Sequence, residues 1–141
     1  MTKPHALAVN VKLIDELEKT YRELVQKQRE LIDLLRALKL LELINFYEKY
    51  SSCSVEETWV LNKIKKKYYY YYVKCKDGRS IYLGKSPEYF NVLKKAAQSA
   101  VRLKEVVDDV NRSLGVLGEQ LMLYIQDIKN ISMLHVEEKR E

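Results

Sequence analysis

The sequence predicts a mainly α-helical fold, in which two long helices pair as an antiparallel helical hairpin, a coiled coil, with a small two- to three-stranded antiparallel β-hairpin inserted at its tip. Glycine and proline are rare, with 4 Gly and 2 Pro among 141 residues, so the chain must consist mostly of long elements. Apolar residues recur at alternating spacings of three and four in both end segments, whereas the segment between them is rich in tyrosine and lysine. We therefore expect a long helix over residues 6–50, a β-hairpin over 57–85 and a second long helix over 86–134.

The first helix is predicted by a heptad pattern of apolar residues that begins at Ile14. Gln28 is the one polar residue in this pattern, and a polar side chain at such a position usually fixes the register or the number of helices. From Leu34 to Tyr47 the apolar stripe broadens, and a seam between two helices cannot bury all of it. The extra surface needs a third element, either the inner face of the hairpin or a second copy of the chain. The expected seam residues are Ile14, Leu17, Tyr21, Leu24, Leu31, Leu35 and Leu38.

The second helix has a clear start, because Ser86 is a good N-cap and Pro87 suits the first helical position. Gly115 and Gly118 fall inside it, and each costs about 1 kcal/mol relative to alanine in a helix. Because the apolar pattern keeps its phase on both sides of them, we expect one continuous helix; the alternative is a separate helix over residues 119–134. The expected seam residues are Tyr89, Leu93, Ala96, Ala100, Leu103, Val107, Val110, Leu114, Leu117, Leu121, Tyr124, Ile128 and Ile131.

Aromatic and β-branched residues on both sides of Asp77-Gly78 predict the β-hairpin, since this dipeptide suits a two-residue hairpin loop. With these two residues as the loop, Lys76 lies opposite Arg79. A third strand is expected around residues 59–64, with a turn at the lysines that follow. Because side chains alternate between the faces of a strand, we expect one face to hold Tyr68, Tyr70, Tyr72, Lys74, Lys76, Arg79, Ile81, Leu83 and Lys85, and the other to hold Tyr69, Tyr71, Val73, Cys75, Ser80 and Tyr82.

The net charge of +5 is concentrated in the middle of the chain, where residues 53–86 carry eight Lys/Arg against three Asp/Glu. Such a density of lysines favours an anionic partner: phosphate backbones release counterions when lysines bind them, tyrosines stack on bases, and a β-ribbon fits the DNA major groove. The alternative is a solvated set of lysines that protects strand edges from aggregation. The residues predicted to contact nucleic acid are Lys63, Lys65, Lys66, Lys67, Tyr68, Tyr70, Tyr72, Lys74, Lys76, Arg79 and Lys85.

The segment from Lys67 to Lys85, KYYYYYVKCKDGRSIYLGK, resembles the tyrosine-rich hairpin of a group of uncharacterised archaeal and archaeal-virus proteins. It is also similar to the small arm-type DNA-binding sheet at the N-terminus of tyrosine recombinases. The shared pattern is an aromatic strand, a turn and a Tyr-Leu-Gly-Lys ending. In the recombinases this module binds DNA while a separate domain cuts it. The resemblance therefore implies contact with DNA but not recombination, since the cutting domain has no counterpart and the long helices depart from the recombinase pattern.

Cys53 and Cys75 are the only cysteines of the chain. Neither has a Cys or His nearby in sequence that would complete a zinc site, so we expect no metal. We expect free thiols in a reducing compartment, with a disulfide between the two as the alternative. Because no apolar stretch could span a bilayer and the first residues lack the regions of a signal peptide, we expect a cytoplasmic protein, associated with the nucleoid if it binds DNA.

Residues typical of catalysis form no recognisable set. His5 and His135 lie near opposite ends of the chain, and no nucleophile–base pair, paired carboxylates or phosphate loop appears. We therefore expect a non-enzymatic protein without cofactor, small-molecule substrate or membrane partner. The main hypothesis is a homo-oligomer, a dimer or larger, that presents the hairpin to nucleic acid, DNA rather than RNA. The alternative is a structural coiled-coil module that recruits another protein, with the hairpin as a docking surface or cap.

Overall fold

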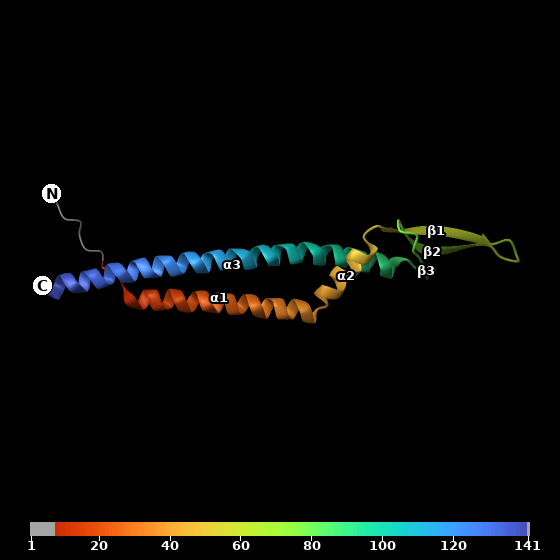
Figure 1. Cartoon of the computed structure of the whole chain (residues 1–141). Coiled ribbons are helices and arrows are strands. Elements are labelled where there is room, and N and C mark those ends of the chain that lie inside the picture. The colour runs from red at the N-terminus through yellow and green to blue at the C-terminus, as the bar shows by residue number, and fades with distance from the viewer. Residues whose placement is uncertain (1–7, 141) are drawn as a thin grey trace. The chain divides into compact units, whose positions relative to one another are not determined.

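The computed structural model describes residues 8–140, with side chains described through residue 134. Three helices and a three-stranded antiparallel sheet follow one another along the chain (Figure 1). This arrangement confirms the predicted mainly α-helical class with a small inserted sheet. The elements are α1 (Val11–Ala37), α2 (Leu40–Tyr50), β1 (Cys53–Leu61), β2 (Lys67–Cys75), β3 (Ser80–Gly84) and α3 (Glu88–Arg140).

The chain divides into two compact units, which are described separately below. The helical unit consists of the residues before Leu34 and those from Val107 onward. The sheet unit is the continuous segment Leu34–Val106. α1 and α3 each contribute residues to both units, whereas α2 and all three strands belong to the sheet unit.

The segment predicted as one helix over residues 6–50 is interrupted at Leu38 and Lys39. Lys39 adopts a left-handed backbone conformation with φ 67° and ψ 31°, and α2 begins at the next residue. The residues around the break are good helix formers, so local propensity gave no sign of it. At its other end α1 begins after Asn10, whose Oδ1 accepts the backbone N–H of Lys12 at 3.1 Å, as an N-cap does. Residues 6 and 7 lie outside the described residues.

α3 is one continuous helix from Glu88 to Arg140. It passes through Gly115 and Gly118 without a break, as the preserved apolar phase predicted. Residues 119–134 therefore do not form the separate helix that was the alternative.

Within the helical unit, α1 and α3 lie side by side and run in opposite directions. Tyr21 donates its hydroxyl to the backbone carbonyl of Leu114 at 2.8 Å. One heptad further along α1, Gln28 donates its amide to the Asn111 side chain at 3.2 Å. The polar residue in the first heptad pattern thus meets a polar partner on the other helix, which is consistent with a role in fixing register.

The packed face of each helix in this unit is rotated from the predicted one. Leu24, Leu31 and Leu117 were expected in the seam but are exposed, and the residue that follows each of them is buried or half-buried instead. The reason is that both helices carry three columns of residues at heptad spacing, and any two neighbouring columns satisfy the three–four rule. The buried or half-buried positions are Ile14, Leu17, Glu18, Tyr21, Val25, Gln28 and Ile32 on α1, and Val107, Leu114, Gly118, Leu121, Ile125, Ile128 and Ser132 on α3.

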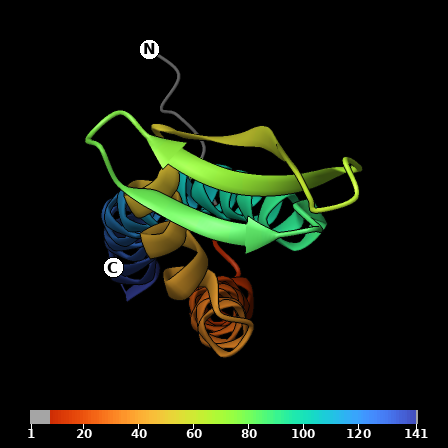
Figure 2. The ribbon, with the colours of Figure 1, turned by 90° about the vertical axis from the view of Figure 1, so that its right-hand side faces the viewer.

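The sheet unit has a compact core between one face of the sheet and the helices. Val73 is fully buried, and Phe90 of α3 is 6% exposed. The rings of Phe46 and Tyr50, both on α2, lie 5.6 and 5.8 Å from the Phe90 ring. Figure 2 shows α2 against one face of the three strands. The inner face of the sheet is thus the third element that covers part of the broad apolar stripe. The core residues are Cys53, Val73, Cys75 and Phe90, surrounded by Phe46, Tyr50, Val55, Ile81 and Leu83.

Candidate nucleic-acid interface

β2 is the central strand of the sheet, with β1 and β3 paired to its two edges. β1 pairs with β2 over their full length, from Cys53 opposite Cys75 to Leu61 opposite Lys67. The expected third strand is therefore present and turns at the lysines, but it begins earlier than the predicted residues 59–64. β3 reaches only as far as Tyr71. Beyond that point β1 and β2 continue as a two-stranded ribbon.

The register between β2 and β3 differs by one residue from the predicted one. Tyr72 lies opposite Tyr82, and Val73 lies opposite Ile81. The loop has three residues instead of two, because the backbone N–H of Cys75 donates to the Arg79 carbonyl at 3.0 Å. A one-residue shift exchanges the two faces of a strand. Ile81 and Leu83 therefore face the core, and Tyr82 joins the tyrosines of β2 on the open face.

Tyrosine rings cluster on this open face. The ring of Tyr82 lies 5.3 Å from that of Tyr72 and 6.0 Å from that of Tyr70. The ammonium of Lys85 lies 5.8 Å from the centre of the Tyr68 ring. Of the predicted contact residues, Tyr68, Tyr70, Tyr72 and Lys85 are thus brought together, and Tyr82, which the wrong register had placed on the other face, belongs with them.

The end of the ribbon, residues 59–69, concentrates positive charge and exposed apolar side chains, and we call it the ribbon tip. It holds four lysines and no acidic residue. Trp59 is 50% exposed and Ile64, in the loop, is 69% exposed. The ammonium of Lys67 lies 4.5 Å above the Trp59 ring. The exposed members of the ribbon tip are Trp59, Val60, Leu61, Lys63, Ile64, Lys65, Lys66, Lys67, Tyr68 and Tyr69.

Asn62 fixes the conformation of the loop at the ribbon tip. Its side-chain oxygen accepts the backbone N–H groups of Ile64 and Lys66, at 3.0 and 2.8 Å. Lys65 occupies the left-handed region with φ 59°. The same three-residue loop recurs at the other hairpin, where Gly78 takes the left-handed position with φ 91°. The lysines of the tip are therefore carried on a backbone that side-chain hydrogen bonds organise before any ligand binds.

Two of the predicted contact residues have partners within the sheet unit. Arg79 donates its Nε to Asp77 at 2.6 Å and another guanidinium nitrogen to the Lys49 carbonyl at 2.5 Å. Its backbone N–H donates to Asp77 at 3.1 Å, and this bond is the main cause that lowers the pKa of the Asp77 carboxyl below its usual 3.8. Lys74 forms an ion pair with Glu56 at 3.2 Å.

These residues, together with exposed Lys76, lie at the end of β2 opposite the ribbon tip. A nine-residue strand spans roughly 30 Å. The single predicted surface is therefore divided, and the tip holds four of its lysines, for none of which an ion pair is seen among the described residues. Arg79 has a structural role in holding the Asp77 turn against the end of α2. The sequence had not indicated that Trp59 and Ile64 lie exposed beside the tip lysines.

Cys53 and Cys75 form a disulfide, which corrects the expectation of free thiols. They are directly opposite each other on β1 and β2, and both sulfur-bearing side chains are buried in the core of the sheet unit. The bond closes the end of the β1–β2 pair that is remote from the ribbon tip. Because the two cysteines are bonded, they give no indication of a reducing compartment.

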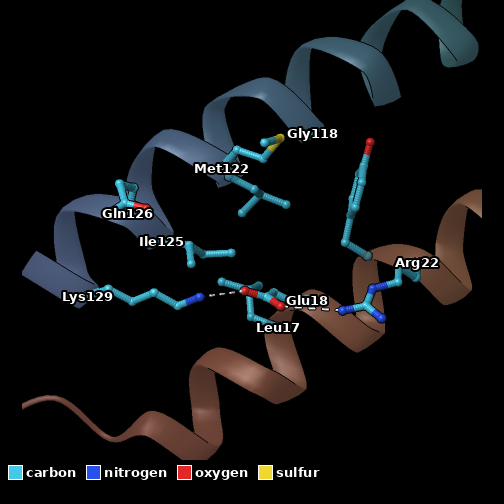
Figure 3. Close-up of a pocket in the computed structure, with 10 residues that line it drawn as sticks. Leu17, Glu18, Arg22, Gly118, Met122, Ile125, Gln126 and Lys129 are labelled. Atoms are coloured by element: carbon cyan, nitrogen blue, oxygen red, sulfur yellow. Dashed lines mark hydrogen bonds and ion pairs between the residues drawn. The ribbon is translucent and has the colours of Figure 1, made fainter.

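Another candidate site is a cleft of about 420 Å³ in the helical unit, between α1 and α3 (Figure 3). Leu17 and Ile125 contribute apolar surface to it. Its rim charges pair with one another, since Glu18 accepts from both Arg22 and Lys129 at 3.4 Å. The rim cations therefore share one carboxylate instead of converging on the cleft, and the ribbon tip remains the stronger candidate for an anionic ligand.

No protein-family model matches the chain, and neither a curated protein nor a solved structure matches it. No helix in the described part of the chain is long and apolar enough to cross a membrane. Among the side chains of residues 8–134, no group of three or more His, Cys, Asp or Glu could hold a metal ion.

Proposed function

We propose that the protein is a non-enzymatic DNA-binding protein and that the ribbon tip holds the phosphate backbone. The observation that carries this proposal is the composition of the tip: four lysines without an acidic residue, on a two-stranded ribbon that also exposes Trp59, Tyr68 and Tyr69. The ammonium groups of these lysines repel one another when a short ribbon holds them close together. Phosphates relieve this repulsion, and the counterions released from the nucleic acid favour association.

The shape of the ribbon favours duplex DNA over RNA. The major groove of B-DNA is wide enough for a two-stranded β-ribbon, whereas the major groove of A-form RNA is too narrow. The loop places Ile64 at the end of the ribbon between Lys63 and Lys65. An apolar side chain in the major groove can contact the methyl group of thymine while neighbouring cations bind the phosphates. The exposed aliphatic residue is therefore compatible with DNA contact.

We further propose that α1 and α3 form an antiparallel coiled coil in the helical unit. The support comes from the helical unit, where the Tyr21–Leu114 and Gln28–Asn111 hydrogen bonds join the two helices one heptad apart on α1. The buried and half-buried positions of this unit follow the three–four alternation on α3 from Leu114 to Ser132.

The test is a fluorescence-anisotropy titration of labelled random-sequence duplex DNA at several salt concentrations. The triple variant Lys63→Gln, Lys65→Gln and Lys66→Gln should bind more weakly. The slope of log affinity against log salt should fall by up to about 2.7, since each phosphate contact contributes about 0.9. Unchanged affinity and slope would contradict the proposal.

A matched control removes three lysines from α1 instead, by changing Lys12, Lys19 and Lys27 to Gln; all three are exposed. Its net charge equals that of the tip variant, so a general effect of charge would weaken both equally. We expect the control to retain nearly the wild-type slope. Circular dichroism should give the same helix content for all three proteins.

The alternative function is that of a protein-interaction module, and the exposed Val60, Leu61 and Ile64 favour it. In that case wild-type protein fails to bind duplex DNA, single-stranded DNA or RNA even at low salt. Vesicles of anionic lipid provide a third arm, because lysines beside exposed aromatic residues also suit a membrane surface. Binding to vesicles without binding to nucleic acid would overturn the DNA proposal.

A further inference from the structure

The helical unit exposes a column of apolar side chains on α1. Leu24 and Leu31 are 47% and 45% exposed. Each comes one residue before a half-buried position, Val25 or Ile32. The exposed column therefore runs along the edge of the packed face at heptad spacing.

α3 carries a matching column. Leu117 comes one residue before buried Gly118, and Tyr124 comes one residue before buried Ile125. Because the exposed members are seven residues apart, they lie on one side of the helix over four successive heptads. These exposed residues are Val110, Leu117, Tyr124 and Ile131.

The two columns lie on the same side of the helix pair. On each helix, the residues of the exposed column come one position before residues of the packed face. When each helix is viewed from its own N-terminus, the exposed column is therefore rotated away from the packed face in the same direction. In two antiparallel helices that face each other, equal rotations bring both columns to one side, whereas in parallel helices they would lie on opposite sides. An open cleft of about 270 Å³ agrees with this arrangement, since it is lined by Leu13 and Leu17 of α1 together with Tyr124 and Ile128 of α3.

The other cleft also has apolar lining residues, but it differs in having charged and amide side chains at its rim. Glu18, Arg22, Gln126 and Lys129 lie there (Figure 3). We call the side of the helix pair that carries the two exposed columns the apolar side; its columns hold no charged residue, whereas Glu18, Arg22 and Lys129 lie at the cleft on the other side. An apolar side of this extent marks an interaction surface.

We infer that a second copy of the chain covers this apolar side, so that the two helix pairs form a four-helix bundle. We call the surface the heptad face; it consists of Leu24, Leu31, Val110, Leu117, Tyr124 and Ile131. From their exposed fractions these residues offer on the order of 500 Å² per copy, so two copies bury roughly 1,000 Å² before the flanking side chains are counted, close to the range of stable interfaces. None of the six residues is charged, as expected for the centre of such an interface.

We assign a second copy to this surface because its own apolar side chains have the same seven-residue spacing as those of the heptad face. The heptad face has the same seven-residue repeat on both helices, and a two-fold axis places an identical repeat against it. The side chains of two such pairs can then interdigitate as they do in four-helix bundles. This inference does not depend on DNA binding, because the ribbon tip belongs to the other unit.

The test is the solution mass measured by sedimentation equilibrium. The wild-type protein should have twice the chain mass of 16.7 kDa. The variant Leu117→Lys, Tyr124→Lys should sediment as a monomer with at least a tenfold weaker self-association. Because lysines in the heptad face could also unfold the protein, the wild type provides a second readout: its unfolding midpoint in urea should rise with protein concentration.

The matched control is Val116→Lys, Leu123→Lys, which changes the preceding residue at each position. Val116 and Leu123 are 59% and 61% exposed, so they are as accessible as Leu117 and Tyr124 but lie outside the heptad face. This control should remain dimeric. A monomeric wild type whose midpoint is independent of concentration, or a control that dissociates as readily as the first variant, would overturn the inference.

Discussion

Gly118 and Gly115 lie three residues apart in α3, but the same substitution should have opposite effects at the two positions. A Cβ at Gly118 would collide with the hydroxyl of Tyr21 and would lie 2.8 Å from its Cζ. A Cβ at Gly115 would meet no atom within 4 Å. The ring of Tyr21 thus requires a glycine at 118, whereas nothing around 115 does.

The magnitudes follow from these contacts. Gly115→Ala should raise the free energy of unfolding by about 1 kcal/mol, the difference in helix propensity. Gly118→Ala gains the same amount but must displace the Tyr21 ring, and overpacking typically costs about 1–3 kcal/mol. It also breaks the Tyr21–Leu114 hydrogen bond, worth about 1 kcal/mol. The net effect at 118 should be a loss of about 1–3 kcal/mol.

Urea denaturation followed by circular dichroism measures both free energies. The Tyr21→Phe change removes the hydroxyl, the nearest of the colliding atoms, so its cost should be smaller in the Gly118→Ala background than in the wild type, which a double-mutant cycle detects. If Gly118→Ala stabilises the protein as much as Gly115→Ala, the placement of Tyr21 over Gly118 is wrong.

Three further predictions concern the sheet unit. Lys65→Gly should stabilise the tip loop by about 1 kcal/mol in urea denaturation by relieving the left-handed conformation, while the salt slope of DNA binding falls by about 0.9; a lower stability would contradict the loop geometry. Because the pKa of Asp77 is lower in the folded protein than in the unfolded chain, the ionised carboxylate stabilises the folded protein above the unfolded pKa, and this stabilisation is lost as the pH falls below about 4. The thermal midpoint of Asp77→Asn should therefore fall less over that range than the wild-type midpoint; equal falls would show that the Asp77 carboxylate does not stabilise the fold. Reduction of Cys53–Cys75 should lower the free energy of unfolding by about 2–4 kcal/mol, and two reactive thiols in the untreated protein would show that the bond is absent.

The elements themselves could be predicted from the sequence because their patterns are local. Alternating spacings of three and four indicate a helix wherever they occur, and this pattern identified α3 despite two glycines. The turn at the lysines before β2 also followed from local composition. The break at Lys39 had no such signal. The helix after it, α2, packs Phe46 and Tyr50 against Phe90 of α3 and the core of the sheet unit, and tertiary packing of this kind can override local propensity.

The pairing of elements was less predictable. The register of β2 and β3 was wrong by one residue, and the packed faces of α1 and α3 were wrong by one column of residues at heptad spacing. Asp77-Gly78 suits a two-residue loop, but Asp77 instead accepts bonds from Arg79 and the loop takes three residues. The sequence led us to expect free thiols, with the disulfide only as the alternative, because the first strand was expected to start after Cys53. Once that strand extends to Cys53, antiparallel pairing places it opposite Cys75.

Trp59 offers the most direct test of DNA binding at the ribbon tip, since it is the only tryptophan of the chain and lies within the tip. Its emission should change on titration with duplex DNA, because the Lys67 ammonium above its ring is drawn to phosphate and the ring is exposed to the bound DNA. The change should saturate at the same DNA concentration as the anisotropy signal, and added salt should reverse it. DNA binding by anisotropy with unchanged Trp59 emission would place the interface elsewhere, and an absence of binding at low salt would contradict the proposed function.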